Sequence, residues 1–207
     1  MKLSFTLLAL LLGITVSCGR KPVHQDVVIE GNTMSHSSTA GHNIQSSPDA
    51  DKAPFELQYI DTTIGLDLTS VDAEQLVATR AQHMDLKKFA KSMIAEGQDE
   101  IASLRQMRTD LFGDTPQAIN LDLLRTRESV QKIDLEKLDL LKENAFDLEF
   151  LRQMVPLDEA AISMANDITG KDAHAELQQL AENIIKNRQA EIEQMKRWEK
   201  DWSKSQN

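Results

Sequence analysis

The sequence predicts an all-α protein, a four-helix bundle built from two repeated helical hairpins. Residues 146–202 align without a gap with residues 55–111, at an offset of 91 positions. Within each unit, apolar residues recur every three or four positions, as they do along one face of a helix. Helix formers dominate the composition, and the 207 residues include only 8 Gly and 5 Pro. Because each hairpin alone would expose its apolar stripe, the two are expected to pack together.

The second unit shows its helices most clearly. Its first helix is expected to run from the capping residue Asn144 to Gly170. Pro156 is expected to kink this helix, since proline removes one backbone donor. The partner helix is expected to begin at Asp172 or His174 and to bury one apolar stripe.

The first unit carries a weaker version of the same pattern. Gly65 stands where the second unit has Pro156, and Thr69 and Ser70 favour a restart of the helix with Asp72 in a capping role. We therefore expect either one helix here or two short helices around a break.

The segment between the units is expected to be a helical connector. Thr115 and Pro116 favour a cap and first turn for a helix over 119–130, and Asp134 is expected to cap a helix over 135–142. One long connection between two equal hairpins is typical of a ferritin-like four-helix bundle. The expected organisation is a signal peptide (1–17), a lipidated cysteine with a flexible tether (18–53), a first hairpin (54–113), the connector (114–145) and a second hairpin (146–207).

The N-terminus resembles the secretion signal of a bacterial lipoprotein. A basic start and a short apolar run precede Ser17, Cys18 and Gly19. The run is too short for an ordinary membrane-spanning helix. In such lipoproteins the cysteine is acylated and becomes the first residue, so we expect Cys18 to anchor the chain to a membrane. Thr15 departs from the usual Leu of this motif, and the alternative is a signal peptide with an incidental cysteine.

The tether and the overall charge limit the range of partners. Residues 19–52 are polar and aperiodic, and they contain Met34, His36 and His42, which are residue types that bind copper. The alternative is an ordinary polar spacer. The formal net charge of -10 argues against nucleic acid as a partner. With a single cysteine, the chain can form no internal disulfide and no thiolate metal cluster.

The repeat units resemble the domain of unknown function 305 family, bacterial envelope proteins that are often predicted to be ferritin-like and in some cases linked to copper. The resemblance rests on Phe146-Asp147, Phe150-Leu151, Met154-Val155-Pro156, Ala160-Ala161-Ile162, Met164-Ala165, His174, Glu176-Leu177, Leu180-Ala181, Ile184-Ile185, Gln189, Glu191-Ile192, Met195 and Trp198. It covers residues 55–202 apart from the connector, and it is specific in the second unit and degenerate in the first.

The main departure from the family pattern concerns a pair of adjacent histidines. In this chain those slots hold Leu66-Asp67 and Leu157-Asp158. Neighbouring helical residues point about 100° apart, so the leucines are expected in the core and the aspartates on the flank of the stripe. There the aspartates could meet a cation or a basic partner, or face solvent, and we favour the solvent-facing alternative.

These observations predict a non-catalytic, lipid-anchored envelope protein with its domain in the periplasm or outside the cell membrane, and an unidentified protein partner. The alternative is a periplasmic protein of copper or other metal homeostasis. No catalytic constellation or phosphate loop is visible. His83 and His174 are expected to cap or pack at helix starts. The weak metal candidates are Met34, His36, His42, Asp67, Met154, Asp158, Met164 and His174. With leucine and lone carboxylates in the histidine slots, the bundle core is expected to bind no copper with useful affinity.

Overall fold

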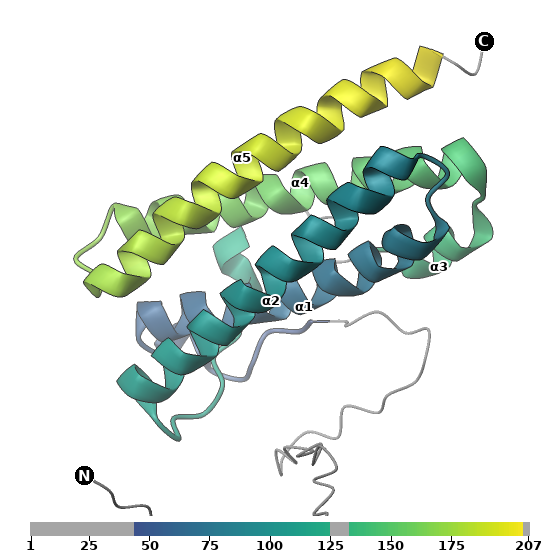
Figure 1. The fold of residues 1–207 in the computed structure, drawn as a ribbon. Helices are drawn as coiled ribbons and strands as arrows, with labels where there is room; N and C mark the ends of the chain where they lie inside the picture. Colours follow the sequence, from purple (N-terminus) through teal and green to yellow (C-terminus); the bar gives the residue numbers. More distant parts are fainter. Residues whose placement is uncertain (1–43, 125–132, 205–207) are drawn as a thin grey trace, which may run out of the picture. The chain divides into compact units, whose positions relative to one another are not determined.

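The computed structural model describes residues 44–124 and 133–204, and these residues form a helical bundle (Figure 1). Its four long helices are α1 (Phe55–Arg80), α2 (Met84–Phe112), α4 (Glu143–Thr169) and α5 (Ala175–Ser203). Three short elements accompany them, the 3-10 helices η1 (Ala50–Lys52) and η2 (Leu121–Leu124) and the helix α3 (Leu135–Leu140). The prediction of an all-α, ferritin-like bundle of two hairpins is confirmed. Cys18, Met34, His36 and His42 lie outside the described residues.

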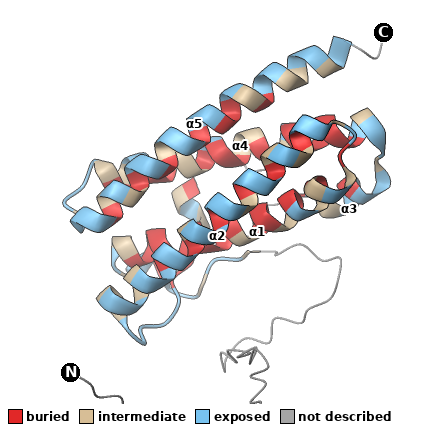
Figure 2. Ribbon diagram, viewed as in Figure 1, coloured by how far each residue is buried: buried red, intermediate tan, exposed pale blue. Residues whose placement is uncertain are grey.

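Each hairpin packs upon itself, and the two hairpins join mainly through their first helices. α1 lies against α2, α4 lies against α5, and α1 also contacts α4. The buried sides of all four helices face inward (Figure 2), and they include large side chains such as Tyr59, Phe146 and Phe150. The apolar stripes thus form one shared core. No helix among residues 44–124 and 133–204 is long and apolar enough to cross a membrane.

The contacts between the hairpins repeat at the 91-residue offset, as an approximate two-fold relation requires. His83 precedes α2, and its Nδ1 lies 2.7 Å from Oδ2 of Asp147 on α4. His174 precedes α5, and its Nδ1 lies 2.9 Å from Oε1 of Glu56 on α1. These four residues are the corresponding pairs of the two repeats. Both histidines occupy N-cap positions, but neither side chain caps its helix. Each turn is held by a carboxylate of the other hairpin instead.

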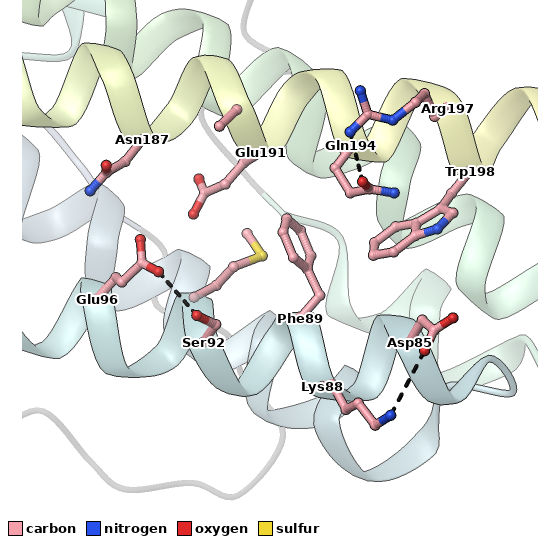
Figure 3. A pocket seen from close by; sticks show the side chains of 12 residues that line it. Asp85, Lys88, Phe89, Ser92, Glu96, Asn187, Glu191, Gln194, Arg197 and Trp198 are labelled. Carbon is pink, nitrogen blue, oxygen red and sulfur yellow. Dashed lines mark hydrogen bonds and ion pairs between the residues drawn. The ribbon is translucent and has the colours of Figure 1, made fainter.

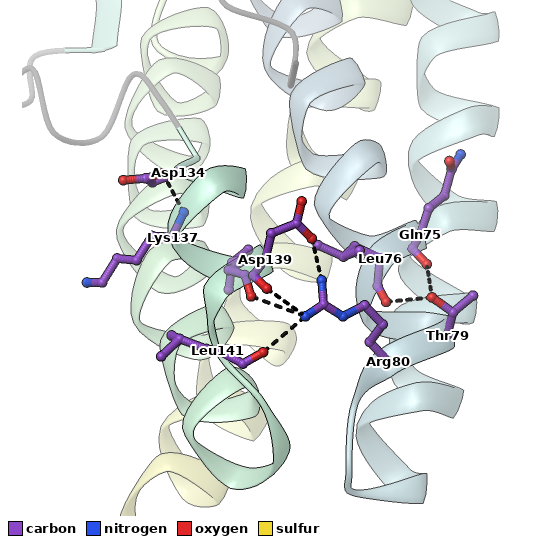
Figure 4. Close-up of polar contacts among 9 residues, drawn as sticks. Gln75, Leu76, Thr79, Arg80, Asp134, Lys137, Asp139 and Leu141 are labelled. Atoms are coloured by element: carbon purple, nitrogen blue, oxygen red, sulfur yellow. Dashed lines mark hydrogen bonds and ion pairs between the residues drawn. The ribbon is translucent and has the colours of Figure 1, made fainter. Parts of the chain in front are cut away.

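Two cation–π contacts follow the same relation. The guanidinium of Arg80 lies 4.8 Å from the ring centroid of Phe146, and the ammonium of Lys171 lies 3.2 Å from that of Phe55. Arg80 also reaches the last turn of α3 (Figure 4), where it pairs with the Asp139 carboxylate and donates to carbonyl oxygens, including that of Leu141 at 3.0 Å. It thereby satisfies acceptors that a helix end leaves free.

Several local predictions differ from the structure. α1 is one continuous helix through Gly65, not two short helices. A Cβ on Gly65 would lie 2.9 Å from Cγ2 of Ile44, so the glycine leaves room for that side chain against α1. Residues 44–53 of the predicted tether therefore include a part that packs on the bundle, where Ala50 is buried and the Ser47 amide donates to the Ile119 carbonyl.

Helix ends account for the remaining differences. Asp134 caps α3 by accepting from the Lys137 amide at 2.9 Å, and Gly170 follows α4, both as predicted. Residues 115–120 form no helix, and the Thr115 hydroxyl donates to the carbonyl of Phe112 at the end of α2. Of the helix expected over 119–130, the structure describes the 3-10 helix η2, and residues 125–132 lie outside the described residues. Asn144 lies inside α4 and donates to the Trp202 carbonyl at 3.2 Å instead of capping.

Candidate functional site: a buried carboxylate–arginine cluster

Carboxylates from all four long helices meet in the bundle interior around one guanidinium. They are Asp67 on α1, Glu100 on α2, Asp158 on α4 and Glu191 on α5, and the guanidinium is that of Arg188 on α5. We call these five residues the carboxylate–arginine cluster. Asp67 corresponds to Asp158, and Glu100 to Glu191, at the offset of the repeat. The residue that corresponds to Arg188 is Gly97, so the carboxylates are duplicated and the arginine is not.

Arg188 contacts the carboxylates through all three of its nitrogen atoms. Nη1 donates to Oε2 of Glu191 at 2.9 Å, and Nη2 lies 3.4 Å from both Oδ1 of Asp67 and Oε2 of Glu100. Nε lies 3.7 Å from Oδ1 of Asp158. The side chain of Arg188 is only 6% exposed. Burying a charge in this way is tolerated only where opposite charges and hydrogen bonds compensate for the lost water.

The aspartates in the histidine slots are therefore buried, contrary to the solvent-facing position that the sequence favours. Asp67 is 3% exposed and Asp158 is 2% exposed, and both meet a basic partner within the same chain. Leu66 and Leu157 lie in the core as expected. A helix that is covered on two sides has more than one buried face, which explains why the flank of the stripe is also inside.

The cluster contains more carboxyl groups than basic groups, and Glu74 on α1 adds a further buried carboxyl group beside it. Burial raises the pKa of Asp67 and of Asp158 well above the ordinary range, against the opposing influence of Arg188. A hydrogen bond between the carboxyl groups of Asp67 and Glu100 further raises the pKa of Asp67. Burial also raises the pKa of Glu74 to about 8. Some of these carboxyls therefore retain a proton at neutral pH.

Among residues 44–124 and 133–204, no N–H group donates to several oxygen atoms of the cluster. These atoms are Oδ2 of Asp67, Oδ2 of Asp158 and Oε1 of Glu100, and Oε2 of Glu74 beside the cluster is in the same position. Tyr59 on α1 is 1% exposed. Burial and the charges of Glu100 and Asp67 raise the pKa of its hydroxyl, so it lies within the field of the cluster. Buried acceptors of this kind need a proton or another cation.

A cavity of about 660 Å³ lies between α2 and α5 and is lined by side chains of both helices (Figure 3). Phe89, Met93 and Trp198 supply apolar walls, and Phe89 meets Trp198 edge to face with ring centroids 5.1 Å apart. Glu191 lines this cavity while it also binds Arg188. The cluster therefore borders a space that opens to the outside of the bundle.

The other candidates from the sequence do not converge on the cluster. Met154 and Met164 are buried in the apolar core. His174 lines a second cavity of about 340 Å³, together with Met107, Asp110 and Glu176. Within the described residues, no three or more His, Cys, Asp or Glu side chains are arranged to hold a metal ion.

Sequence reasoning missed Arg188, Glu100, Glu191 and Glu74. A signal was present in α5, because Arg188 lies four residues from both Ile184 and Ile192, and Glu191 lies four residues before Met195, so both place charge at positions of the apolar stripe. Charged residues at stripe positions are almost never buried without partners.

Residues 122–199 match the family model described as domain of unknown function (DUF305). The resemblance to DUF305 is confirmed. The match begins within the connector and covers most of the second hairpin, where the motif is specific. No curated protein sequence matches the chain.

Solved structures support the DUF305 fold. The structure described as "CopM in the Cu(II)-bound form" is 26% identical with a TM-score of 0.63, covering 71% of this chain and 97% of that one. "CopM in the Cu(I)-bound form" is 26% identical with a TM-score of 0.60, over 71% and 96%. A DUF305 fragment from Deinococcus radiodurans, at 19% identity and a TM-score of 0.59, covers 70% of this chain and 94% of its own, and shares the fold.

Proposed function

We propose that this chain is a non-catalytic, lipid-anchored protein of the bacterial envelope whose bundle is a binding or structural module without the paired-histidine metal motif. One observation carries the proposal. Asp67 and Asp158, which occupy slots where the family places histidines, are buried and paired with Arg188. The Arg188 guanidinium already lies against both carboxyl groups, and the neighbouring leucines offer no donor atom to a metal.

Copper or another metal is the second candidate, favoured by the CopM structures with bound copper and by the cavity at His174. There Nδ1 of His174 lies 2.9 Å from Glu56, an arrangement that orients the other ring nitrogen for a metal, and Met107 offers a thioether in the same cavity. The tether residues Met34, His36 and His42 are a further soft-ligand set. Binding there is expected to be weak, because ordering a loose chain costs entropy.

The test is metal analysis of the mature chain purified without chelators, followed by titration with Cu(I) in competition with a chelator. We expect Met34→Ala, His36→Ala and His42→Ala together to abolish any binding, and Met107→Leu to leave it unchanged. Submicromolar Cu(I) binding that survives the triple change and is lost in Met107→Leu would establish the second candidate instead. Restoring the motif with Leu66→His, Asp67→His, Leu157→His and Asp158→His serves as the positive control.

The membrane anchor is tested separately. Acyl chains stabilise membrane binding by about 0.8 kcal/mol per buried methylene, so their loss should release the protein. Cys18→Ala is expected to move the chain to the soluble fraction and to abolish the incorporation of labelled fatty acid. A variant that stays with the membrane, alongside an unlabelled wild type, would contradict the anchor.

A further inference from the structure

We propose that the cavity between α2 and α5 binds an elongated organic cation, namely a primary ammonium group at one end of an apolar body that carries an aromatic ring at the other. The ammonium group lies between Glu96 and Glu191, and the ring lies against Phe89 and Trp198. The inference goes beyond the proposed function, because it depends neither on the membrane anchor nor on copper.

The aromatic end of the cavity is the first argument. Phe89 from α2 and Trp198 from α5 are both half-buried and both line the cavity. Their rings meet edge to face with centroids 5.1 Å apart, and Trp198 stacks on Trp202 with centroids 5.3 Å apart. The buried side chain of Met93 lines the cavity on α2 as well. Held in place by these contacts, the rings offer a fixed surface to an apolar or aromatic group.

The acidic end lies two helical turns away from the aromatic end. α2 and α5 run in opposite directions, because Phe89 near the start of α2 meets Trp198 near the end of α5. Glu96 follows Phe89 by seven residues, and Glu191 precedes Trp198 by seven residues. Seven residues span about 10 Å along a helix, so both carboxylates lie on the same side of the aromatic pair. Figure 3 shows the two carboxylates in the space between the helices.

The electrostatics of this end favour a positive charge. Glu96 accepts from the hydroxyl of Ser92 at 3.0 Å, so that partner is neutral. The side chain of Glu191 is 6% exposed. Burial raises the pKa of Glu191, against the lowering influence of Arg188, and the charge of Glu96 raises it further. A cation between the two carboxylates relieves their repulsion, and an ammonium group can also donate charge-assisted hydrogen bonds to both.

The basic residues of the cavity lie at its aromatic end and already have acidic neighbours. Nζ of Lys88 lies 3.9 Å from Oδ1 of Asp85, and Nη1 of Arg197 lies 3.9 Å from Oε2 of Glu193. The side chains of Lys88 and Arg197 are 72% and 59% exposed, so solvent screens them. The partly enclosed charge of the cavity is therefore that of the carboxylates, and the orientation of the ligand follows from it.

The size of the cavity fits a small molecule of this shape. Its volume of about 660 Å³ lies within the range of pockets that hold such ligands, roughly 300–1,000 Å³. A ligand that fills both ends needs its ammonium group and its ring about 10 Å apart, which is the length of two helical turns. Phenylhexylamine, with an amine and a phenyl ring at opposite ends of a chain of six methylene groups, has this length and is protonated at neutral pH.

The test is isothermal titration calorimetry of the full mature chain with phenylhexylamine at neutral pH. We expect one molecule to bind per chain. Phenylhexanol has the same body without the charge and should bind about tenfold more weakly, since it loses the charge-assisted hydrogen bonds. Phenylhexanoate, which carries the opposite charge, should show no binding. Benzylamine is too short to reach both ends and should bind more weakly than phenylhexylamine.

Matched variants locate the binding. Glu96→Gln and Trp198→Leu should each weaken the binding of phenylhexylamine by about tenfold. Glu193→Gln is the control, because it removes the same charge from a side chain of α5 that is 75% exposed and does not line the cavity. Circular dichroism checks that each variant is folded, and the ligand series on the wild type needs no variant.

Four results would overturn the proposal. The first is no binding of phenylhexylamine by the wild type. The second is equal affinity for phenylhexanol, which would make the cavity a merely apolar groove. The third is equal weakening by Glu96→Gln and Glu193→Gln, which would show nonspecific attraction by a negatively charged protein. The fourth is a dimer in sedimentation experiments that phenylhexylamine neither binds nor dissociates, which would mean that a second copy covers the cavity.

Discussion

Replacing Glu74 by glutamine should remove a measurable part of the pH dependence of folding. Glu74 is 2% exposed, and its Oε2 has no hydrogen-bond partner within the described residues. Burial, together with the charges of Glu191, Glu96 and Glu100, raises its pKa from 4.5 to about 8, although Arg188 opposes this. Between these two pH values the folded chain holds a proton on Glu74 that the unfolded chain has released.

The sign and size of the effect follow from this proton. Because the folded state binds more protons, the free energy of unfolding falls as pH rises, by about 1.4 kcal/mol per pH unit for one proton. The difference between 4.5 and about 8 corresponds to about 5 kcal/mol in all, lost by pH 8 and fully present below pH 4.5. Glutamine keeps the shape and cannot ionise, so Glu74→Gln should become more stable than the wild type as pH rises.

The assay is urea unfolding followed by circular dichroism at intervals from pH 5 to pH 8. The slope of the free energy of unfolding against pH should be less negative in Glu74→Gln than in the wild type by about 1.4 kcal/mol per unit. Glu193→Gln is the control, because the Glu193 side chain is 75% exposed and its change should leave the slope unaltered. Equal slopes in Glu74→Gln and the wild type would show that Glu74 is ionised in the folded chain and would refute the reasoning.

Three further predictions concern packing. Leu157→Ala should reduce the free energy of unfolding by roughly 2–5 kcal/mol, measured by urea unfolding, because it leaves a cavity in the core; an effect below 1 kcal/mol would mean that the site collapses. Gly65→Ala should loosen the segment from Ile44 to Ala50 and speed its cleavage by a protease, since the new Cβ would lie 2.9 Å from Cγ2 of Ile44. An unchanged rate of cleavage in this segment would contradict the prediction. Arg80→Ala should speed amide exchange in α3 by freeing the carbonyls that it binds, whereas Lys87→Ala, which loses a single bond to Thr79, should not.

The hairpins could be predicted because their signals are local. The stripe, its proline and the glycine after it place the first helix of the second unit at 144–170, and α4 runs from Glu143 to Thr169. The continuity of α1 could not be predicted in the same way. Gly65 by itself predicts a break in the helix. Only the packing of Ile44, which lies 21 residues earlier in the chain, shows why a glycine is tolerated inside α1. Tertiary packing overrides propensity at such a position.

Only part of the cluster could be predicted from the sequence. The repeat showed that Asp67 and Asp158 are equivalent, but their partner Arg188 is 121 positions from one and 30 from the other. No local pattern links residues at such separations. What the sequence does show is charge at stripe positions of α5, and in a chain with an otherwise regular stripe this indicates a buried ion pair.

The covalent joining of the two hairpins has a consequence for the single arginine. Two identical hairpins, associated as separate chains around a two-fold axis, would present every interface residue twice. At the centre of the bundle they could supply two guanidinium groups or none. In one chain, position 188 can be arginine while position 97 stays glycine. The fused repeat can therefore hold a single arginine in the bundle interior, whereas a symmetric pair of identical chains would hold two or none.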